Sequence, residues 1–542
     1  MRPVTRAVVA VIAVACLVTA VVIAASGGLR PAAAPQTAAV TTPSSSPSSV
    51  PSSTPVSAAS AAPVASPTPS AWDVALAKAQ SLPLEVAAGQ VIMADVSSPD
   101  PEAAARLVRS RHLAGVILMG AAITDADGVT ALTGALAAAD REREWPVIIA
   151  TDEEGGTVQR LSPVIGHVSA FMAAGANGDA AQIEAYYAGL GAQMAQLGFT
   201  MDFAPVADVT IGTKDPTIRT RSAGSHPDAV AGVVTSAWQG LASGGVTPVI
   251  KHFPGHGSVT TDSHTGLPVQ SASLAKLAKR DMVPFATAIE DGVPAVMMGH
   301  IRVTAWGKAP ATVNPRAYAY LRDTLGFDGL IVTDAMNMAA ITDRYSGGKA
   351  AVLALAAGAD LVLMPAHLDA SIAGIVAAVE DGTLSRERLD DAVAHVIVAS
   401  AAVSSAATGA VQPQRPQEFV EGSIVVAAKS CGALIGDEVR IVGGTTAQRS
   451  TLAGELKARG VTVGDAGTSI LLVGGDRGHG TADVVVATGG PWGLADSHAT
   501  AYVATWGTGA AQMRALAAVL AGDVAPRGTW PVGLSLPYTA CT

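Results

Sequence analysis

Charged and imidazole side chains gather in a few short strings, each directly after a run of apolar residues. The strings that stand out are Asp152-Glu153-Glu154, Asp202 with Asp208 shortly beyond, Lys251-His252, and Asp334. Carboxylates, Lys and Arg can make directional, charge-assisted hydrogen bonds in a partly dry pocket. A further string, Asp262-Ser263-His264, adds an imidazole, whose unperturbed pKa of about 6.5 lets it donate and accept protons near neutral pH. Together these residue types predict a site that holds a polar ligand and transfers protons.

Each of these motifs also has a purely structural interpretation. Asp334 precedes the stretch 335–341 and could merely cap a helix there, because Asp is a favoured N-cap residue. An Asp-x-His string in a polar loop, taken alone, is more typical of a solvated turn. Arg221 or Asp208 could form only structural ion pairs, since charged residues at strand ends often satisfy one another.

The elements that must position these residues follow a regular rhythm of apolar runs with helical stretches between them. Amphipathic segments such as 180–197 and 274–290 separate the runs. We count eight runs, at 89–96, 115–119, 146–151, 200–205, 247–251, 295–298, 329–333 and 360–364. This pattern predicts an α/β fold, a (β/α)8 TIM-like barrel, whose strand ends form the catalytic face. A doubly wound open sheet is the alternative.

The strings themselves resemble a known family. The sequence Lys251-His252-Phe253-Pro254-Gly255-His256-Gly257, followed by Asp262-Ser263-His264, resembles glycoside hydrolase family 3, specifically its β-N-acetylglucosaminidase branch acting on peptidoglycan fragments. The β-glucosidase branch departs from this pattern after the Lys-His pair and lacks the Asp-Ser-His loop. The resemblance runs from about 82 to 398. A weaker one, over 419–536, is to the family's second α/β sandwich domain.

The resemblance implies catalytic roles for three residues. Asp334 would attack the anomeric carbon and form a glycosyl-enzyme ester, as a retaining mechanism requires. His264 would be the general acid and base on a mobile loop, oriented by Asp262, which would fix its tautomer. The reaction would need no cofactor, and the sequence shows no metal-binding spacing or phosphate-binding Gly loop.

The resemblance also implies a set of substrate-binding residues. The side chains that would hold the hydroxyl groups of the non-reducing sugar are Asp152, Arg160, Lys251 and His252. Arg221 corresponds to an arginine that the family usually shows in an Arg-Ser-Phe-Gly string. This chain departs there, with Ala223 in place of the Phe and His226 in place of the following acidic residue. We interpret His256 only as lining the site.

The ends of the chain predict further parts. Arg2 and Arg6 precede an apolar run, which makes residues 1–34 a signal peptide or membrane anchor and the protein exported or attached to the cell envelope. The parts that follow are a disordered Ala/Ser/Pro/Thr-rich stalk (35–70), the barrel (71–400), a linker (401–417) and a second α/β sandwich-like domain (418–542). The second domain has buried-strand runs at 439–442, 469–473 and 484–487.

Composition limits the partners. The chain of 542 residues carries a net charge of −10 and no block of Lys or Arg, which argues against a nucleic-acid partner. The three cysteines, Cys16, Cys431 and Cys541, offer neither a metal-ligand spacing nor a disulfide framework. A membrane contact is expected only through the N-terminal segment, and the sequence leaves the oligomeric state open.

The function expected from the sequence is exo-acting hydrolysis of terminal β-linked GlcNAc from GlcNAc-MurNAc fragments of peptidoglycan, with a small carbohydrate or muropeptide as substrate. Three alternatives stay open: a β-glucosidase-like enzyme, a phosphorolytic enzyme of the same family, and a non-catalytic wall-binding protein that keeps the barrel for recognition.

Overall fold

The computed structural model describes residues 70–140, 143–406 and 415–541, and the chain from Pro67 onward forms one compact unit. The predicted signal or anchor, the stalk up to residue 69 and residues 407–414 of the predicted linker lie outside the described residues. None of the helices within the described ranges is both long and apolar enough to cross a membrane.

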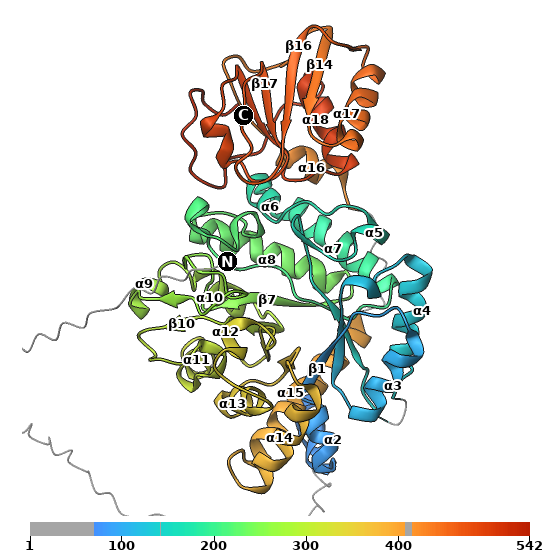
Figure 1. The fold of residues 1–542 in the computed structure, drawn as a ribbon, viewed down its shortest axis with the longest axis vertical. Helices are drawn as coiled ribbons and strands as arrows, with labels where there is room; N and C mark the ends of the chain where they lie inside the picture. Colours follow the sequence, from blue (N-terminus) through green and yellow to red (C-terminus); the bar gives the residue numbers. More distant parts are fainter. Residues whose placement is uncertain (1–69, 141–142, 407–414, 542) are drawn as a thin grey trace, which may run out of the picture. The chain divides into compact units, whose positions relative to one another are not determined.

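Eight parallel strands form the first sheet (Figure 1). Seven of them fall within a predicted apolar run, and the eighth, β7, begins with its predicted run 247–251 but continues two residues beyond it. The strands are β1 (Ile92–Val96), β2 (Gly115–Leu118), β3 (Ile148–Thr151), β6 (Met201–Asp202), β7 (Thr247–Phe253), β9 (Ala295–Met298), β11 (Leu330–Thr333) and β12 (Val362–Leu363). Their order around the sheet is β11-β9-β7-β6-β3-β2-β1-β12. The first predicted run began too early, because Gly89 ends helix α2 (Leu84–Gly89) instead of opening a strand.

The sheet closes on itself. A bridge between Val332 and Leu361 joins β11 to the chain entering β12, and the Thr333 amide donates to the Leu361 carbonyl at 3.0 Å. A buried apolar cluster with members from all eight strands, among them Ile117 and Met297, fills the barrel interior. Alternate residues such as Val116 belong instead to the larger core that includes the surrounding helices. The barrel prediction is therefore confirmed, and the open doubly wound alternative is wrong.

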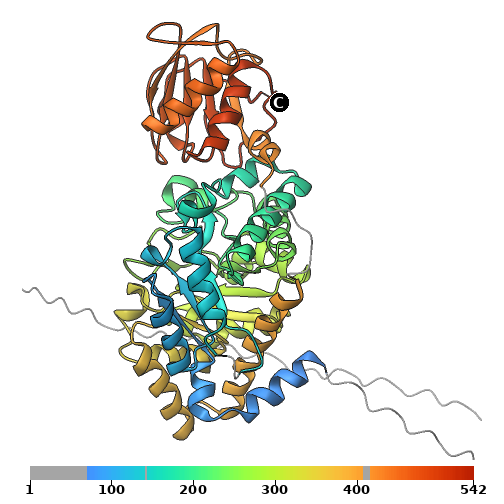
Figure 2. The same cartoon turned by 90° about the vertical axis from the view of Figure 1, so that its right-hand side faces the viewer.

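Helices cover the outside of the barrel (Figures 1 and 2), and their ends follow simple sequence signals. Asp179 caps α7 (Ala180–Gln196), which matches the predicted helix. The predicted helix 274–290 is instead two helices, α9 (Leu274–Leu277) and α10 (Val283–Glu290). Pro284 lies in the first turn of α10, where its missing N–H is tolerated, and in a continuous helix it would break the hydrogen-bond ladder.

The remaining barrel helices precede, connect or follow the strands. They include α1 (Ala71–Ser81), α3 (Pro101–Arg111), α4 (Ala126–Ala137), α8 (Pro227–Ser243), α11 (Pro315–Ala319), α12 (Ala339–Thr342), α13 (Lys349–Ala357), α14 (Leu368–Glu380) and α15 (Arg386–Ala406). A short hairpin of β4 (Glu153–Gly155) and β5 (Val158–Gln159) follows β3 directly. This hairpin places the Asp152-Glu153-Glu154 string at the carboxyl edge of the barrel.

A second, six-stranded sheet follows α16 (Gln417–Ser423). Its strands are β13 (Val425–Ala428), β14 (Glu438–Gly443), β15 (Thr462–Val463), β16 (Thr468–Val473), β17 (Val484–Ala487) and β18 (Ala501–Ala504). Only the β13–β18 pair is antiparallel. Helices α17 (Thr446–Ala458) and α18 (Ala510–Ala521) pack together on one face of this sheet (Figures 1 and 2). The three strands predicted for this region are present, as is its α/β layering.

The interpretation of the cysteines is wrong in one respect. Cys431 and Cys541 form a disulfide across 110 residues of sequence. The pair meets because the last residues run beside β13, where the Cys541 amide donates to the Val426 carbonyl at 2.9 Å and Ala540 bridges to Ala427. Two cysteines so far apart carry no spacing signal, so only the folded strand order reveals the bond.

Candidate active site

The predicted site residues converge on one cavity of about 240 Å³ at the carboxyl ends of the barrel strands. The predicted residues that line it are Asp152, Arg160, Arg221, Lys251, His252, His256, His264 and Asp334. Asp262 does not line the cavity but contacts His264. Every lining residue lies between Ile117 and Met364, so the second domain contributes none of them.

Asp334 lies directly after β11 and is 8% exposed. Its backbone N–H donates to the Met298 carbonyl at 2.9 Å, and its Oδ1 accepts the Ala335 N–H at 2.8 Å. The helix-capping alternative is wrong, because α12 begins only at Ala339 and has Met338 at its N-cap. The side chain is thus held by the barrel edge instead of by a helix end.

The electrostatic surroundings of Asp334 favour its charged form. Burial alone would raise the pKa of Asp334, but the imidazoles of His300 and His252, the Ala335 N–H and the Lys251 cation hold it below its usual value. The carboxylate is therefore ionised at neutral pH. An ionised, buried carboxylate on a rigid strand end is suited to nucleophilic attack.

His300 is a residue of the site that the sequence analysis missed. It follows β9, is fully buried, and its Nδ1 lies 2.6 Å from Thr312 Oγ1 while its Nε2 lies 2.9 Å from the Ala335 carbonyl oxygen. Burial lowers the pKa of His300, while the Asp334 carboxylate acts in the opposite direction. The available signal was its position two residues after a predicted strand, but no other polar residue lies beside it in the sequence to mark it as part of a site.

Four charged side chains form a buried ion network beside the cavity. Lys251 Nζ lies 2.7 Å from Asp152 Oδ1 and 2.6 Å from Glu154 Oε1. Arg221 contacts both Glu154 oxygens, with Nε 2.7 Å from Oε2 and Nη2 2.8 Å from Oε1. Glu154, for which no role was predicted, is the centre of the network. Arg221 therefore has the structural ion pair that the sequence analysis left open, and it also lines the cavity.

The network fixes the charges of its members. Burial alone would raise the pKa of Glu154, but Arg221 and Lys251 hold it well below its usual range. Burial alone would lower the pKa of Lys251, but Asp152 and Glu154 raise it above its usual value. Asp152 is the partly exposed member, since 18% of its side chain is accessible, against 3% for Lys251 and 1% for Glu154. A polar ligand would therefore meet the Asp152 carboxylate in a fixed position.

His252 and Asp208 form a second buried pair. The His252 Nδ1 lies 2.7 Å from Asp208 Oδ2, and Asp208 Oδ1 also accepts the backbone N–H groups of His252 and His256 at 3.2 and 2.6 Å. Asp208 is fully buried. It therefore has the structural role that the sequence left open, as the residue that orients the His252 ring.

The Asp262–His264 dyad lies on the loop after β7. Asp262 Oδ1 accepts the backbone N–H of His264 at 2.9 Å and lies 2.8 Å from its Nδ1. Burial would raise the pKa of Asp262, but these contacts with His264 hold it below its usual value. The side chain of His264 is 62% exposed, against 34% for that of Asp262. The ring thus lies at the open side of the cavity, with an ionised carboxylate on its Nδ1.

The loop that departs from the family string is held by a serine. Ala223, which replaces the expected Phe, is 2% exposed. The Ser222 hydroxyl oxygen lies 2.7 Å from the Asp208 carbonyl oxygen and 2.8 Å from that of Gly224, and its single proton can be donated to either. The loop therefore packs into the barrel without an aromatic side chain.

Two buried carboxyl groups lie beside the ion network without cationic hydrogen-bond partners. Asp202 Oδ1 accepts the Glu153 N–H at 2.9 Å, and Glu153 Oε2 accepts the Leu161 N–H at 2.7 Å. Asp202 Oδ2 and Glu153 Oε1 have no hydrogen-bond partner among the described residues, and neither does Arg160 Nε. Burial raises the pKa of Asp202 well above its usual value. Burial also raises the pKa of Glu153 to about 7, although the hydrogen bonds from the Leu161 and Arg160 amides lower it.

The raised pKa of Glu153 predicts a pH-dependent stability. The folded protein binds the Glu153 proton more tightly than the unfolded chain does. The free energy of unfolding therefore falls as pH rises from about 4.5 through about 7, and it does not fall further from this cause at higher pH. Glu153→Gln removes this fall and keeps an acceptor for Leu161. At about 1.4 kcal/mol per pKa unit, the variant should gain on the order of 3 kcal/mol over wild type between pH 4.5 and pH 8. Denaturant unfolding at both pH values measures it.

The matched control for this prediction is Glu184→Gln, at an exposed position of α7. Its stability relative to wild type should be the same at both pH values. If Glu153→Gln shows an equally constant difference, Glu153 is ionised in the folded protein throughout this range and the raised pKa is wrong.

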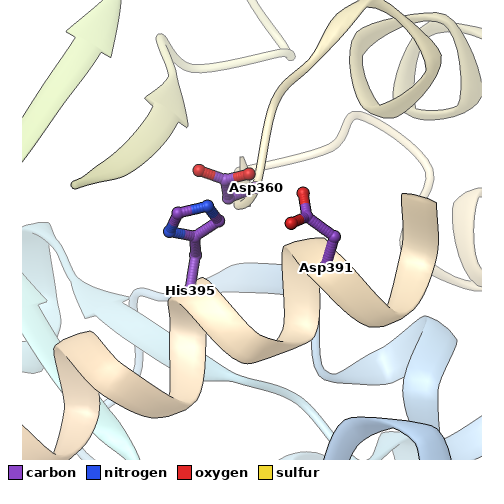
Figure 3. A group of neighbouring side chains, drawn as sticks. All are labelled: Asp360, Asp391 and His395. Atoms are coloured by element: carbon purple, nitrogen blue, oxygen red, sulfur yellow. The ribbon is translucent and has the colours of Figure 1, made fainter. Parts of the chain in front are cut away.

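The described residues contain one group of side chains with the spacing of a metal site, Asp360, Asp391 and His395 (Figure 3). Asp360 precedes β12, whereas the catalytic candidates follow their strands. Arg322 lies 2.7 Å and Arg388 lies 2.9 Å from Asp360, and Arg388 also pairs with Asp391. Two guanidinium groups already neutralise these carboxylates and would repel a cation. We interpret the group as an ion-pair network that stabilises the amino-terminal edge of the barrel.

Comparison with known proteins gives the site its family context. The model of the glycosyl hydrolase family 3 N-terminal domain matches residues 83–399. The β-hexosaminidase LpqI of Mycobacterium tuberculosis is 36% identical over 312 residues, which cover 55% of this chain and 78% of that protein. A β-N-acetylglucosaminidase/β-glucosidase of Cellulomonas fimi is 30% identical over 327 residues, covering 58% of this chain and 57% of that protein.

A solved structure extends the similarity to both sheets. The glycoside hydrolase family 3 β-N-acetylglucosaminidase from Paenibacillus sp. str. FPU-7 superposes with a TM-score of 0.74 at 27% identity, covering 84% of this chain and 99% of that one. The family match spans more than half of the 542 residues. From the closed barrel, the converging strand-end residues and this match, we conclude that the chain is a glycoside hydrolase and belongs to glycosyl hydrolase family 3.

Proposed function

We propose that this chain is an exo-acting, retaining β-N-acetylglucosaminidase that removes terminal GlcNAc from GlcNAc-MurNAc fragments of peptidoglycan. The observation that carries the proposal is that Asp334 and His264 line one cavity, with Asp262 in contact with the His264 ring. The relatives named β-hexosaminidase and β-N-acetylglucosaminidase support the sugar preference.

The first step of the proposed mechanism forms a covalent intermediate. The Asp334 carboxylate attacks the anomeric carbon, and the bond from that carbon to the leaving-group oxygen breaks. His264, as imidazolium, donates its proton to this oxygen. The carboxylate of Asp262 on Nδ1 stabilises the positive ring before transfer and fixes the tautomer afterwards.

The second step releases the sugar. Neutral His264 removes a proton from a water molecule, whose oxygen attacks the anomeric carbon and displaces the Asp334 carboxylate. Two displacements at one carbon retain its configuration. Meanwhile Asp152, with Lys251 fixed against it, Arg160 and His252 would hold the hydroxyl groups of the non-reducing sugar through charge-assisted hydrogen bonds.

We also propose that the protein is exported and acts at the cell envelope. The basic and apolar N-terminal residues have the pattern of a signal or anchor. The Cys431–Cys541 disulfide adds independent support, because disulfides persist mainly in oxidising compartments outside the cytoplasm.

Product analysis tests the proposed reaction. The purified protein is given chitobiose, a GlcNAc-MurNAc muropeptide and a matched β-glucoside, each with and without inorganic phosphate. We expect free GlcNAc, released first as the β-anomer in proton NMR, at a rate that phosphate does not change. Sugar phosphate as the product would mean phosphorolysis, a faster reaction on the β-glucoside would mean glucosidase specificity, and no product at all would favour the non-catalytic alternative.

A further inference from the structure

His256 is a buried imidazole that the mechanism above does not use. It is 1% exposed, and its Nε2 lies 3.1 Å from the hydroxyl of Ser263. Its Nδ1 has no hydrogen-bond partner among the described residues. Its backbone is fixed as well, because its N–H donates to Asp208 Oδ1 at 2.6 Å. The start of the loop after β7 is therefore attached to the barrel at His256, whose ring reaches Ser263 further along the same loop through one polar contact.

Ser263 is the residue between the two members of the dyad. It is 2% exposed, whereas the side chains of Asp262 and His264 are 34% and 62% exposed. Its carbonyl accepts the Ala340 N–H at 3.3 Å. Ala340 belongs to α12, which follows the nucleophile's strand. The serine is therefore a buried anchor between two more exposed neighbours, with His256 on one side and α12 on the other.

We propose that His256 and Ser263 form a latch that holds the acid/base loop against the barrel and so keeps His264 opposite Asp334. His256 is thus a positioning residue for proton transfer and not a proton donor itself. The inference rests on the proposed acid/base role of His264. It also connects the latch to the predicted substrate-binding residue His252, because the same Asp208 carboxylate fixes both the His252 ring and the His256 backbone.

The chemistry of the ring suits a latch that stays closed at working pH. Burial and the neighbouring His252 lower the pKa of His256 to about 4, so the imidazole remains neutral above that value. A neutral imidazole has one protonated nitrogen, and Nε2 can either donate to the Ser263 oxygen or accept from its hydroxyl. Either arrangement keeps the contact, and a neutral ring does not compete with His264 for the role of acid.

Removing the contact should affect most the steps that need a positioned proton. When a buried hydrogen bond loses one partner, the equilibrium between the held and the released segment shifts by about 10- to 100-fold towards the released form. We expect Ser263→Ala to lower kcat/KM on chitobiose by roughly this factor. On 4-nitrophenyl-GlcNAc, whose leaving group needs no protonation, kcat/KM should fall less than about 3-fold.

A double-mutant cycle on the full-length protein isolates the latch. His256→Phe keeps the ring volume without the nitrogens, and the double variant with Ser263→Ala should be no worse on chitobiose than His256→Phe alone. His256→Gln, which can offer an amide near the position of Nε2, should recover part of the activity. Ser258→Ala is the matched control, because that hydroxyl lies in the same loop but accepts from Gln270 Nε2. It should leave both substrates unaffected.

The outcomes separate the latch from the proposed function. Additive losses of His256→Phe and Ser263→Ala, or equal losses on both substrates, would overturn the latch and make His256 a packing or sugar-contacting residue. Unchanged kinetics of Ser263→Ala, in a sample with the wild-type circular dichroism spectrum and melting temperature, would overturn it too. His264→Ala is measured in parallel: if it shows no substrate-dependent loss, the proposed acid/base role fails first, and the latch fails with it.

Discussion

Replacing Asp334 by asparagine is expected to reduce kcat to below about one hundredth of wild type, a loss of more than roughly 3 kcal/mol of transition-state stabilisation. The amide nearly matches the carboxylate in shape but cannot form the glycosyl ester. Its oxygen can still accept the Ala335 N–H that Asp334 Oδ1 accepts now, at 2.8 Å. The backbone N–H bond to Met298 is independent of the side chain. Folding should therefore be intact.

The measurement is turnover of 4-nitrophenyl-GlcNAc together with the melting temperature. Asp343→Asn makes the same chemical change at an exposed position after α12 and should leave both unchanged. Asp334→Gly should regain activity in azide, because the small anion can enter the space of the missing carboxylate and attack the same carbon. A residual kcat of more than a hundredth in pure Asp334→Asn would show that another group is the nucleophile.

The sequence predicted the barrel and the location of the site because both depend on local pattern. Each buried strand of a parallel barrel appears as a short apolar run, and side chains that follow the runs must meet at the carboxyl edge. Asp152 and Asp334 come directly after such runs and Lys251 ends one, and the structure brings all three to one cavity. Their convergence needed no information about which strands are neighbours.

What the sequence could not supply are the partners that depend on tertiary contacts. Glu153 and Glu154 are adjacent in the sequence, yet Glu154 is paired with two cations while Glu153 is buried without a cationic hydrogen-bond partner. Alternation along the β4 hairpin decides this, and periodicity cannot resolve it in so short an element. The disulfide of Cys431 and Cys541 depends on the path of the last residues beside β13, which no spacing rule encodes.

The helix after Asp334 shows a different limit. An Asp before an apolar stretch is a good N-cap signal, but the chain turns through four further residues before α12 begins at Ala339. In this turn the Ala335 carbonyl oxygen contacts His300 Nε2, and the Ala335 N–H donates to the Asp334 carboxylate. Tertiary hydrogen bonds here outweigh local propensity, and they do so at the residue that the mechanism requires to be exposed to the cavity.

The second large effect is expected from His264→Ala, and it depends on the leaving group. With chitobiose, departure of the second sugar needs a proton, and losing a positioned acid costs about 10²–10⁴-fold in rate. With 4-nitrophenyl-GlcNAc, the phenolate leaves unaided, so the first step should suffer far less. The second step still lacks its base, so the glycosyl-enzyme should accumulate, with a burst of nitrophenol and a lowered apparent KM.

Asp262→Asn should show the same pattern more mildly. Its remaining oxygen can still accept the His264 N–H groups that Asp262 Oδ1 accepts now, at 2.9 and 2.8 Å, but the charge that supports an imidazolium is gone. His367→Ala, at an exposed histidine before α14, is the matched control and should not distinguish the two substrates. Equal losses of His264→Ala on chitobiose and the aryl glycoside, without a burst or a change in KM, would mean that His264 only shapes the pocket. The proton would then have to come from another group, and of the other histidines lining the cavity, His256 is neutral above about pH 4 and His252 is bound through Nδ1 to Asp208.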